Sequence, residues 1–105
     1  MSWEIKYHKE AQKELETLDH SQRLQVLKAI EKVSENPLPK YEGGYGKPLS
    51  NNSSTKLAGY FKIKLLKLGI RVVYGLVKED EIMKIVVISV RADDIVYKLA
   101  NKRTK

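Results

Sequence analysis

Three strand-like segments follow one another in the second half of the chain, and this succession most restricts the folds it can adopt. Residues 60–66 alternate apolar and polar side chains, residues 71–77 are β-branched and aromatic, and residues 82–90 form a nearly unbroken apolar run. Such a run is typical of a buried central strand. The separators at 67–69 and 78–81 are short enough for hairpins, so the sequence predicts three antiparallel strands.

The first part of the chain predicts one further strand and two helices. Residues 2–7 alternate like a short strand, and residues 8–18 place apolar side chains at helical spacing. Asp19 or Ser21 can cap a second helix that runs to about Glu35, because both residue types accept hydrogen bonds from a helix N-terminus. Two consecutive helices with single apolar stripes are expected to form a hairpin on a sheet.

The remaining segments complete the predicted fold. Residues 37–56 are rich in Pro, Gly, Ser and Asn and predict a long loop beside the strands. Asp93 can cap a short last helix that runs through Leu99, and the polar end at 101–105 is expected to fray. The sequence therefore predicts an α+β fold in the order βααβββα, with an antiparallel sheet packed against an N-terminal helical hairpin. The length fits a single domain over residues 1–105, with the helices on one face of the sheet.

Positive charge is concentrated in the middle of the chain. The formal net charge is +7 at pH 7, and no acidic residue lies between Glu42 and Glu79. Like charges that cluster on a folded surface repel one another, so stability alone does not favour this arrangement. A polyanion such as the phosphate backbone of a nucleic acid would neutralise it. The basic residues of this segment are Lys47, Lys56, Lys62, Lys64, Lys67, Arg71 and Lys78.

Strand periodicity gathers three of these cations. In the strand at 60–66, alternate residues face the core, so Lys62 and Lys64 share the opposite, open face. A turn centred between Lys67 and Leu68 would place Lys64 directly opposite Arg71, where like charges are unfavourable in a purely structural sheet. We therefore predict an anion-binding site at this face. The core-facing residues of the strand are Phe61, Ile63 and Leu65.

Several segments, in this order, resemble the RelE branch of the RelE/ParE toxin superfamily. They are FKIKL at 61–65, GIRVVY at 69–74, VISVR at 87–91 and VY at 96–97. The resemblance extends over essentially the whole chain, including the predicted helical hairpin. Members of this superfamily are the toxin halves of bacterial type II toxin–antitoxin pairs. The resemblance implies an endoribonuclease that cuts messenger RNA in the ribosomal A site.

The family's catalytic set consists of two strand lysines, an arginine on the next strand, an arginine after the last strand and a tyrosine near the C-terminus. Carried over residue by residue, the resemblance implies that these are Lys62, Lys64, Arg71, Arg91 and Tyr97. The chemistry is coherent, because a ribose 2′-hydroxyl can attack the neighbouring phosphate when a base and cations assist. A lysine beside other cations is pushed toward its neutral form and can act as that base.

The roles expected within this set differ. Lys64 is the expected base, and it could exchange roles with Lys62. Lys62 and Arg71 would stabilise the charge on the phosphate, and Arg91 would act on the side of the leaving group. Tyr97 would stack on the substrate or hydrogen-bond to it. Three more basic residues are expected to bind RNA around this set, and they are Lys47, Lys56 and Lys67.

The implied partners are the ribosome, messenger RNA and a dedicated antitoxin protein, with no cofactor. Two other functions stay open from the sequence. A ParE-like DNA gyrase poison would share the fold but would not need the basic catalytic set. A non-catalytic RNA-binding module would use the same charges without cutting.

Composition argues against several other classes of protein. The chain has no cysteine, and its two histidines, His8 and His20, have no other ligand types near them at metal spacing. No metal site is therefore expected. The N-terminus lacks the features of a signal peptide, and no apolar run approaches the roughly 20 residues that span a bilayer. We therefore expect a cytoplasmic protein without a membrane partner.

Overall fold

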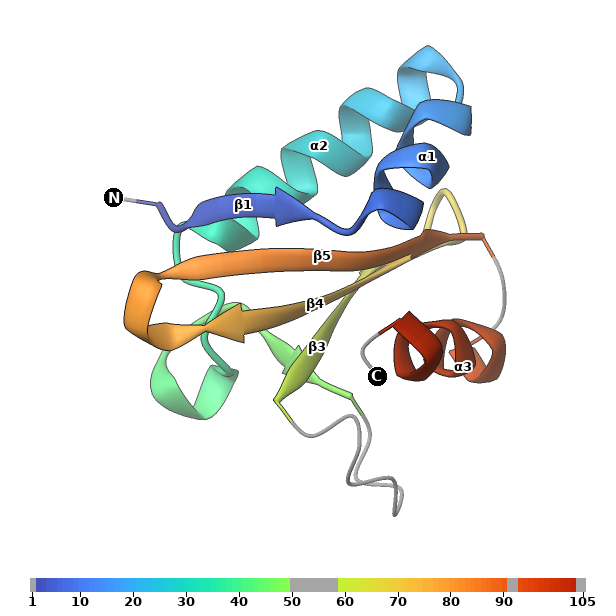
Figure 1. The fold of residues 1–105 in the computed structure, drawn as a ribbon. Coiled ribbons are helices and arrows are strands. Elements are labelled where there is room, and N and C mark those ends of the chain that lie inside the picture. Colours follow the sequence, from blue (N-terminus) through green and yellow to red (C-terminus); the bar gives the residue numbers. More distant parts are fainter. Residues whose placement is uncertain (1, 50–58, 91–92, 104–105) are drawn as a thin grey trace.

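A five-stranded mixed sheet forms the centre of the computed structural model, which describes residues 2–49, 59–90 and 93–103. The strand order is β1-β5-β4-β3-β2, and the ribbon is shown in Figure 1. The α+β class predicted from the sequence is confirmed. In chain order the strands are β1 (Glu4–Tyr7), β2 (Lys47–Pro48), β3 (Tyr60–Leu65), β4 (Ile70–Val77) and β5 (Ile82–Ser89).

Two helices form the predicted N-terminal hairpin, α1 (Lys9–Thr17) and α2 (His20–Ser34). His8 caps α1 through its ring Nδ1, which accepts a backbone N–H at 3.1 Å. Asp19, one of the two predicted caps, serves α2 in the same way at 2.8 Å. The hairpin buries its apolar stripe against one face of the sheet, where Leu15 and Ile30 lie in the larger hydrophobic cluster.

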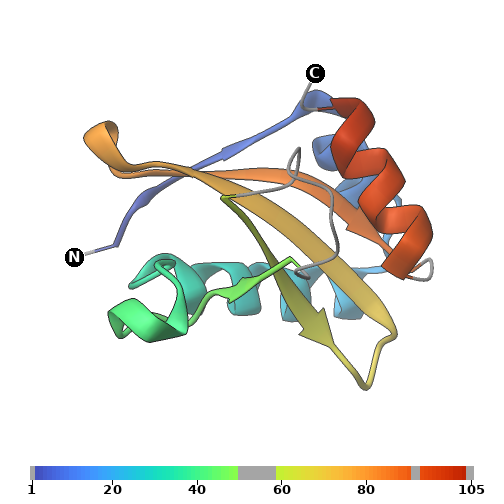
Figure 2. The ribbon, with the colours of Figure 1, turned by 90° about the horizontal axis from the view of Figure 1, so that it is seen from below.

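The third helix, α3 (Asp93–Arg103), packs on the opposite face of the sheet, as Figures 1 and 2 show. The expectation that all helices cover one face is therefore wrong. A helix covers the second face as well because β4 and β5 are apolar on both faces. Val73 and Val87 point away from the helical hairpin, and Val96 and Ala100 of α3 cover them.

The expectation of a wholly antiparallel sheet is also wrong, because β1 pairs with β5 in parallel, from Glu4 opposite Ile82 to Tyr7 opposite Ile85. The remaining pairings are antiparallel. Parallel pairing needs a long crossover. Here the intervening chain includes both N-terminal helices and strands β2 to β4. Local sequence patterns do not encode which distant strand a segment will join.

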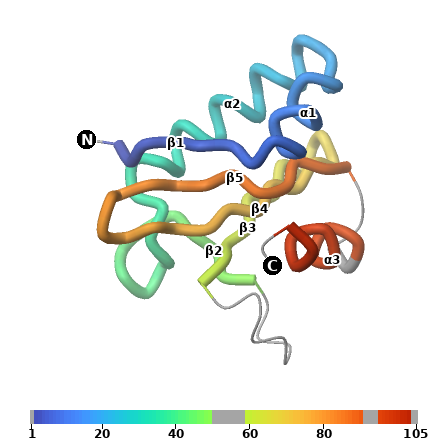
Figure 3. The backbone as a smooth tube through the Cα atoms, in the orientation of Figure 1, coloured from blue at the N-terminus to red at the C-terminus, as the bar shows by residue number. Residues whose placement is uncertain are grey.

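The predicted loop at 37–56 contains regular structure that the sequence pattern did not indicate. A short 3₁₀ helix spans Lys40–Glu42, and β2 pairs with β3 at the edge of the sheet, as the tube in Figure 3 shows. Gly46 is required before β2, since a Cβ there would lie 2.7 Å from the hydroxyl oxygen of Tyr74. Residues 50–58 of this segment lie outside the described residues.

Two further boundaries differ from the prediction. The separator after β4 is a short 3₁₀ helix, Lys78–Asp80, followed by Glu81 in the left-handed region at φ 53°. Helix α3 continues beyond Leu99 to Arg103, so residues 101–103 are helical where fraying was expected. An ion pair at Arg103, described below, accounts for this extension. Over the described residues, no helix is long and apolar enough to cross a membrane.

Tyr74 joins the sheet to the segment after α2. Its side chain is completely buried, stacks on Phe61 at 5.3 Å between ring centroids, and donates a hydrogen bond of 2.9 Å to the carbonyl of Pro37. Burial raises the pKa of the Tyr74 hydroxyl well above its usual value. The folded state therefore holds this proton at a pH at which the unfolded chain releases it.

We expect stability to fall at alkaline pH because of Tyr74. Below about pH 10, the protonated Tyr74 hydroxyl should make its full contribution to the free energy of unfolding. Above that pH, the free energy of unfolding should fall by up to about 1.4 kcal/mol per pH unit. Tyr74→Phe should reduce that slope, and should cost about 1–3 kcal/mol at neutral pH because the Pro37 carbonyl loses its donor. Urea unfolding at several pH values measures both effects. Tyr41→Phe, at a tyrosine that is 82% exposed, is the control. An unchanged slope in Tyr74→Phe would contradict this assignment.

Candidate functional site

Strand β3 presents two lysines on the face of the sheet opposite the helical hairpin. Phe61 is buried in the larger core cluster, and the alternate residues Ile63 and Leu65 pack against that cluster. Lys62 and Lys64 consequently point to the other face, as predicted, with Lys62 half-buried and Lys64 exposed.

The predicted hairpin register is confirmed, since Lys64 lies directly opposite Arg71. Residues that face one another across antiparallel strands have Cβ atoms about 4.5–5.5 Å apart. The Arg71 side chain is half-buried and its Nε is enclosed, so the guanidinium is held close to the sheet. Together Lys62, Lys64 and Arg71 form the basic cluster of the protein.

Tyr97 of α3 meets this cluster from the helix that covers the same face. The Nζ of Lys62 donates a hydrogen bond of 3.1 Å to the Tyr97 hydroxyl and lies 5.8 Å from the centre of its ring. The two residues are far apart in the sequence, so only the packing of α3 brings them together. The structure thus gathers four of the five residues that the sequence suggested for catalysis.

The rim of the cluster carries two more of the predicted basic residues. Lys47 on edge strand β2 lies opposite Lys62, and Lys67 is exposed in the β3–β4 turn. A small hollow of about 60 Å³ lies at the turn end of the β3–β4 hairpin, lined by Lys64, Arg71 and their neighbours in the turn. Since one water occupies about 30 Å³ of liquid, the hollow is too small to enclose a nucleotide. The site is therefore an open surface suited to an extended or macromolecular anion.

Two predicted site residues, Arg91 and Lys56, lie outside the described residues. Among the described residues, no three His, Cys, Asp or Glu side chains lie close enough together to hold a metal ion.

Sequence reasoning missed Glu14 and Arg103, which connect α1 to α3. Their side chains form an ion pair at 2.8 Å between Glu14 Oε1 and Arg103 Nη1. The available signal was weak: Arg103 continues the buried stripe of Val96 and Ala100 at helical spacing. That spacing places Arg103 on the face of α3 that meets the sheet, but nothing in the sequence pairs it with Glu14.

Comparisons with known proteins agree with the fold and the resemblance described above. No protein-family model matches the chain. A protein of Escherichia coli named as a RelE-like toxin is 31% identical over 108 residues, and the match covers 100% of both chains. A variant of the E. coli toxin RelE in the free state has a TM-score of 0.72 at 26% identity, covering 98% of both chains.

A further solved structure, the intact E. coli RelBE toxin–antitoxin complex, contains a chain that shares the fold. Its TM-score is 0.68 at 22% identity, covering 88% of this chain and 99% of that one. The decisive comparison is the sequence match, because it extends over the full length of both proteins at 31% identity. Together with the shared fold, it shows that this chain belongs to the RelE-like toxin family.

Proposed function

We propose that this chain is the toxin of a type II toxin–antitoxin pair and that it cuts messenger RNA in the ribosomal A site. The observation that carries the proposal is the meeting of the basic cluster with Tyr97 on one open face of the sheet. Membership of the RelE-like family supports the toxin part of the proposal. The composition of the site supports the RNA part, because clustered cations and an aromatic ring suit a phosphate chain with exposed bases.

The proposed reaction is an attack by a ribose on its own 3′-phosphate. The 2′-hydroxyl loses its proton to a base, its oxygen bonds to phosphorus, and the bond from phosphorus to the 5′-oxygen of the next nucleotide breaks. That leaving oxygen takes up a proton, so the products are a 2′,3′-cyclic phosphate and a 5′-hydroxyl. Cations that surround the phosphate stabilise the negative charge that builds up in the transition state.

The geometry suggests how the residues share these tasks. Lys62 donates to Tyr97, which suits a cationic ammonium that is held in place beside the phosphate. Lys64 is exposed on the same face, where a substrate can reach it, so we assign it as the base. Arg71, opposite Lys64, supplies a second cation to the phosphate. Arg91 is proposed for the leaving-group side, and Tyr97 for orienting the substrate.

The RNA contacts outside the catalytic set are proposed from charge, and the antitoxin is proposed from a related complex. Lys47, Lys56 and Lys67 would bind RNA around the site, because cationic side chains neutralise its phosphates. An active cationic ribonuclease would harm the cell that makes it. The occurrence of a related fold in a toxin–antitoxin complex supports a dedicated antitoxin that restrains this chain.

We expect cleavage that does not need a metal held by this chain. Purified ribosomes that hold a defined message should yield fragments with a 5′-hydroxyl and a 2′,3′-cyclic or 3′-phosphate. The yield should persist when EDTA is added below the Mg²⁺ concentration that keeps ribosomes intact. Primer extension maps the cut sites, and end labelling with and without phosphatase identifies the termini. A 5′-phosphate product would contradict attack by the 2′-hydroxyl.

The same assay separates the two alternatives. RNA binding without cuts, in ribosomes and in induced cells, would identify a non-catalytic RNA-binding module. Growth arrest with intact messages and broken DNA would instead identify a gyrase poison. Cuts confined to translated messages at the A site would support the proposed function against both.

A further inference from the structure

Helix α3 is a short element whose position depends on how it packs against the sheet. It is only eleven residues long, and isolated helices shorter than about 12–15 residues are marginal in water. Its fully buried side chains include Val96 and Ala100, which pack on the valines of β4 and β5. Apolar contacts of this kind are non-directional. They hold the helix on the sheet but leave its rotation and its sliding along the sheet weakly defined.

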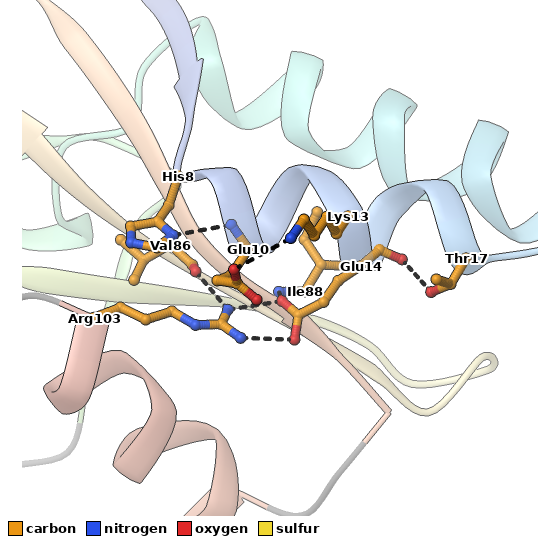
Figure 4. A network of polar contacts seen from close by, with 8 residues as sticks. All are labelled: His8, Glu10, Lys13, Glu14, Thr17, Val86, Ile88 and Arg103. Carbon is orange, nitrogen blue, oxygen red and sulfur yellow. Dashed lines mark hydrogen bonds and ion pairs between the residues drawn. The ribbon is translucent and has the colours of Figure 1, made fainter.

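A directional contact fixes the C-terminal end of α3. The guanidinium of Arg103 donates to both carboxylate oxygens of Glu14, at 2.8 Å from Nη1 and 3.0 Å from Nη2. The two side chains are mostly buried, with 11% of Arg103 and 25% of Glu14 exposed. Figure 4 shows this pair between α1 and α3. A two-pronged, charge-assisted pair of this type defines geometry as well as adding stability.

The pair is also bonded to the backbone of β5, past the end of β1. Arg103 Nη1 donates to the carbonyl of Val86 at 2.9 Å, and Glu14 Oε1 accepts from the N–H of Ile88 at 3.0 Å. The pairing of β4 with β5 is irregular at this point, since Val73 faces Val87 and the next residue, Tyr74, faces Ile85. Such a bulge leaves one residue, here Val86, without a partner in β4. The Glu14–Arg103 pair bonds to the carbonyl of Val86 and to the N–H of Ile88, and so joins α1, β5 and α3 at one place.

Tyr97 lies in the first half of α3, and Arg103 lies at its C-terminal end. Tyr97 precedes Arg103 by six residues, about 9 Å along the axis at 1.5 Å per residue. A hydrogen bond of 3.1 Å between the Tyr97 hydroxyl and Lys62 requires a defined rotation of α3. At the C-terminal end of α3, the hydrogen bonds of Arg103 to Glu14 and Val86 help to define that rotation.

From these contacts we infer that Glu14 and Arg103 are positioning residues for the catalytic face. They set the rotation and register of α3, and thereby hold the Tyr97 hydroxyl on Lys62, without contacting the RNA themselves. The inference rests on the proposed function for its effect on cleavage, but its effect on the position of Tyr97 is independent of it. It assigns a role at the catalytic face to two residues that bond to β5, a strand that β4 separates from β3.

The structural test follows α3 directly. In Arg103→Met, the amide exchange of residues 96–100 should accelerate by about tenfold or more, because charge-assisted hydrogen bonds are lost. The NMR resonances of the Tyr97 ring, assigned with Tyr97→Phe, should shift as well. Glu14→Gln retains an acceptor for Ile88 but loses the charge, and should change exchange in the same direction. Lys102→Met removes an exposed charge from the same turn and is the matched control. Unchanged exchange and unchanged Tyr97 resonances in Arg103→Met would overturn the inference.

The functional test is a double-mutant cycle. Arg103→Met should slow cleavage by about 10- to 100-fold, the range for a displaced orienting group. In a Tyr97→Phe background, the same change should alter the rate by less than about twofold, because the bond that Arg103 preserves is already absent. Equal losses in both backgrounds would show a merely structural role and would overturn the inference.

A milder substitution guards against a folding defect. Arg103→Lys keeps the charge but cannot present the planar fork to both carboxylate oxygens, so its effects should fall between those of the parent and Arg103→Met. Parent protein that cuts no RNA, while exchange and Tyr97 resonances respond as expected, would count against the proposed function alone. Parent protein that cuts RNA, while neither responds, would count against the positioning role alone.

Discussion

Lys64→Ala protein is expected to fold normally and to lose the growth arrest that the parent causes on induction. Lys64 is exposed and lies opposite another cation, so its removal should change the free energy of unfolding by less than about 0.5 kcal/mol. Its loss from a preorganised site should cost on the order of 2.7–4 kcal/mol of transition-state stabilisation, or about 10²–10³ in rate. Single-turnover cleavage on programmed ribosomes measures this loss, and urea unfolding measures stability.

Two companion variants make this expectation specific to the site. Arg71→Ala should lose activity to a similar extent, but with a measurable loss of stability, because its side chain is half-buried against the sheet. Lys28→Ala removes the same charge from an exposed position of α2, on the helical hairpin, and should leave both activity and stability unchanged. Undiminished growth arrest by folded Lys64→Ala protein would remove Lys64 from the catalytic assignment.

The basic cluster could be predicted from the sequence because every step of it is local. Strand alternation alone separates Lys62 and Lys64 from Phe61, and a short turn fixes the pairing of Lys64 with Arg71. A one-residue error in the turn would have moved that pairing, but it would also have turned the apolar residues of one strand away from the core. The helical hairpin is local in the same sense, since caps such as Asp19 mark its boundaries.

The strand pairings and the ion pair that were missed depend on contacts between distant parts of the chain. No local pattern specifies that β1 joins β5 in parallel, or that an edge strand forms at Lys47. The apolar character of β5 on both faces did signal that a second layer was needed, yet it did not say which helix would supply it. The Glu14–Arg103 pair is the hardest of these features to predict, because its two residues meet only when α1 and α3 have both packed on the sheet.

The basic cluster has a consequence for the proposed antitoxin. A partner that silences this site by covering it would contact Lys62, Lys64 and Arg71 through a surface that carries acidic side chains. Opposite charges also steer two proteins together before contact and raise association rates by about 10- to 1,000-fold. Salt screens that attraction over roughly 8–10 Å at physiological ionic strength. The rate of association should therefore be high at low salt and fall steeply as salt is added.

We expect the association rate with the product of the neighbouring gene to fall at least about tenfold between low and high salt. Stopped-flow mixing at several salt concentrations measures it. A double variant, Lys62→Gln with Lys64→Gln, should lower the rate at low salt and flatten its salt dependence, because the attracting charges are gone. Lys28→Gln, with one charge removed from the hairpin face, should keep most of both. A rate that is indifferent to salt would mean that the antitoxin leaves the basic cluster uncovered, so inhibition would have to act through another surface, such as displacement of α3 and the Tyr97 it carries.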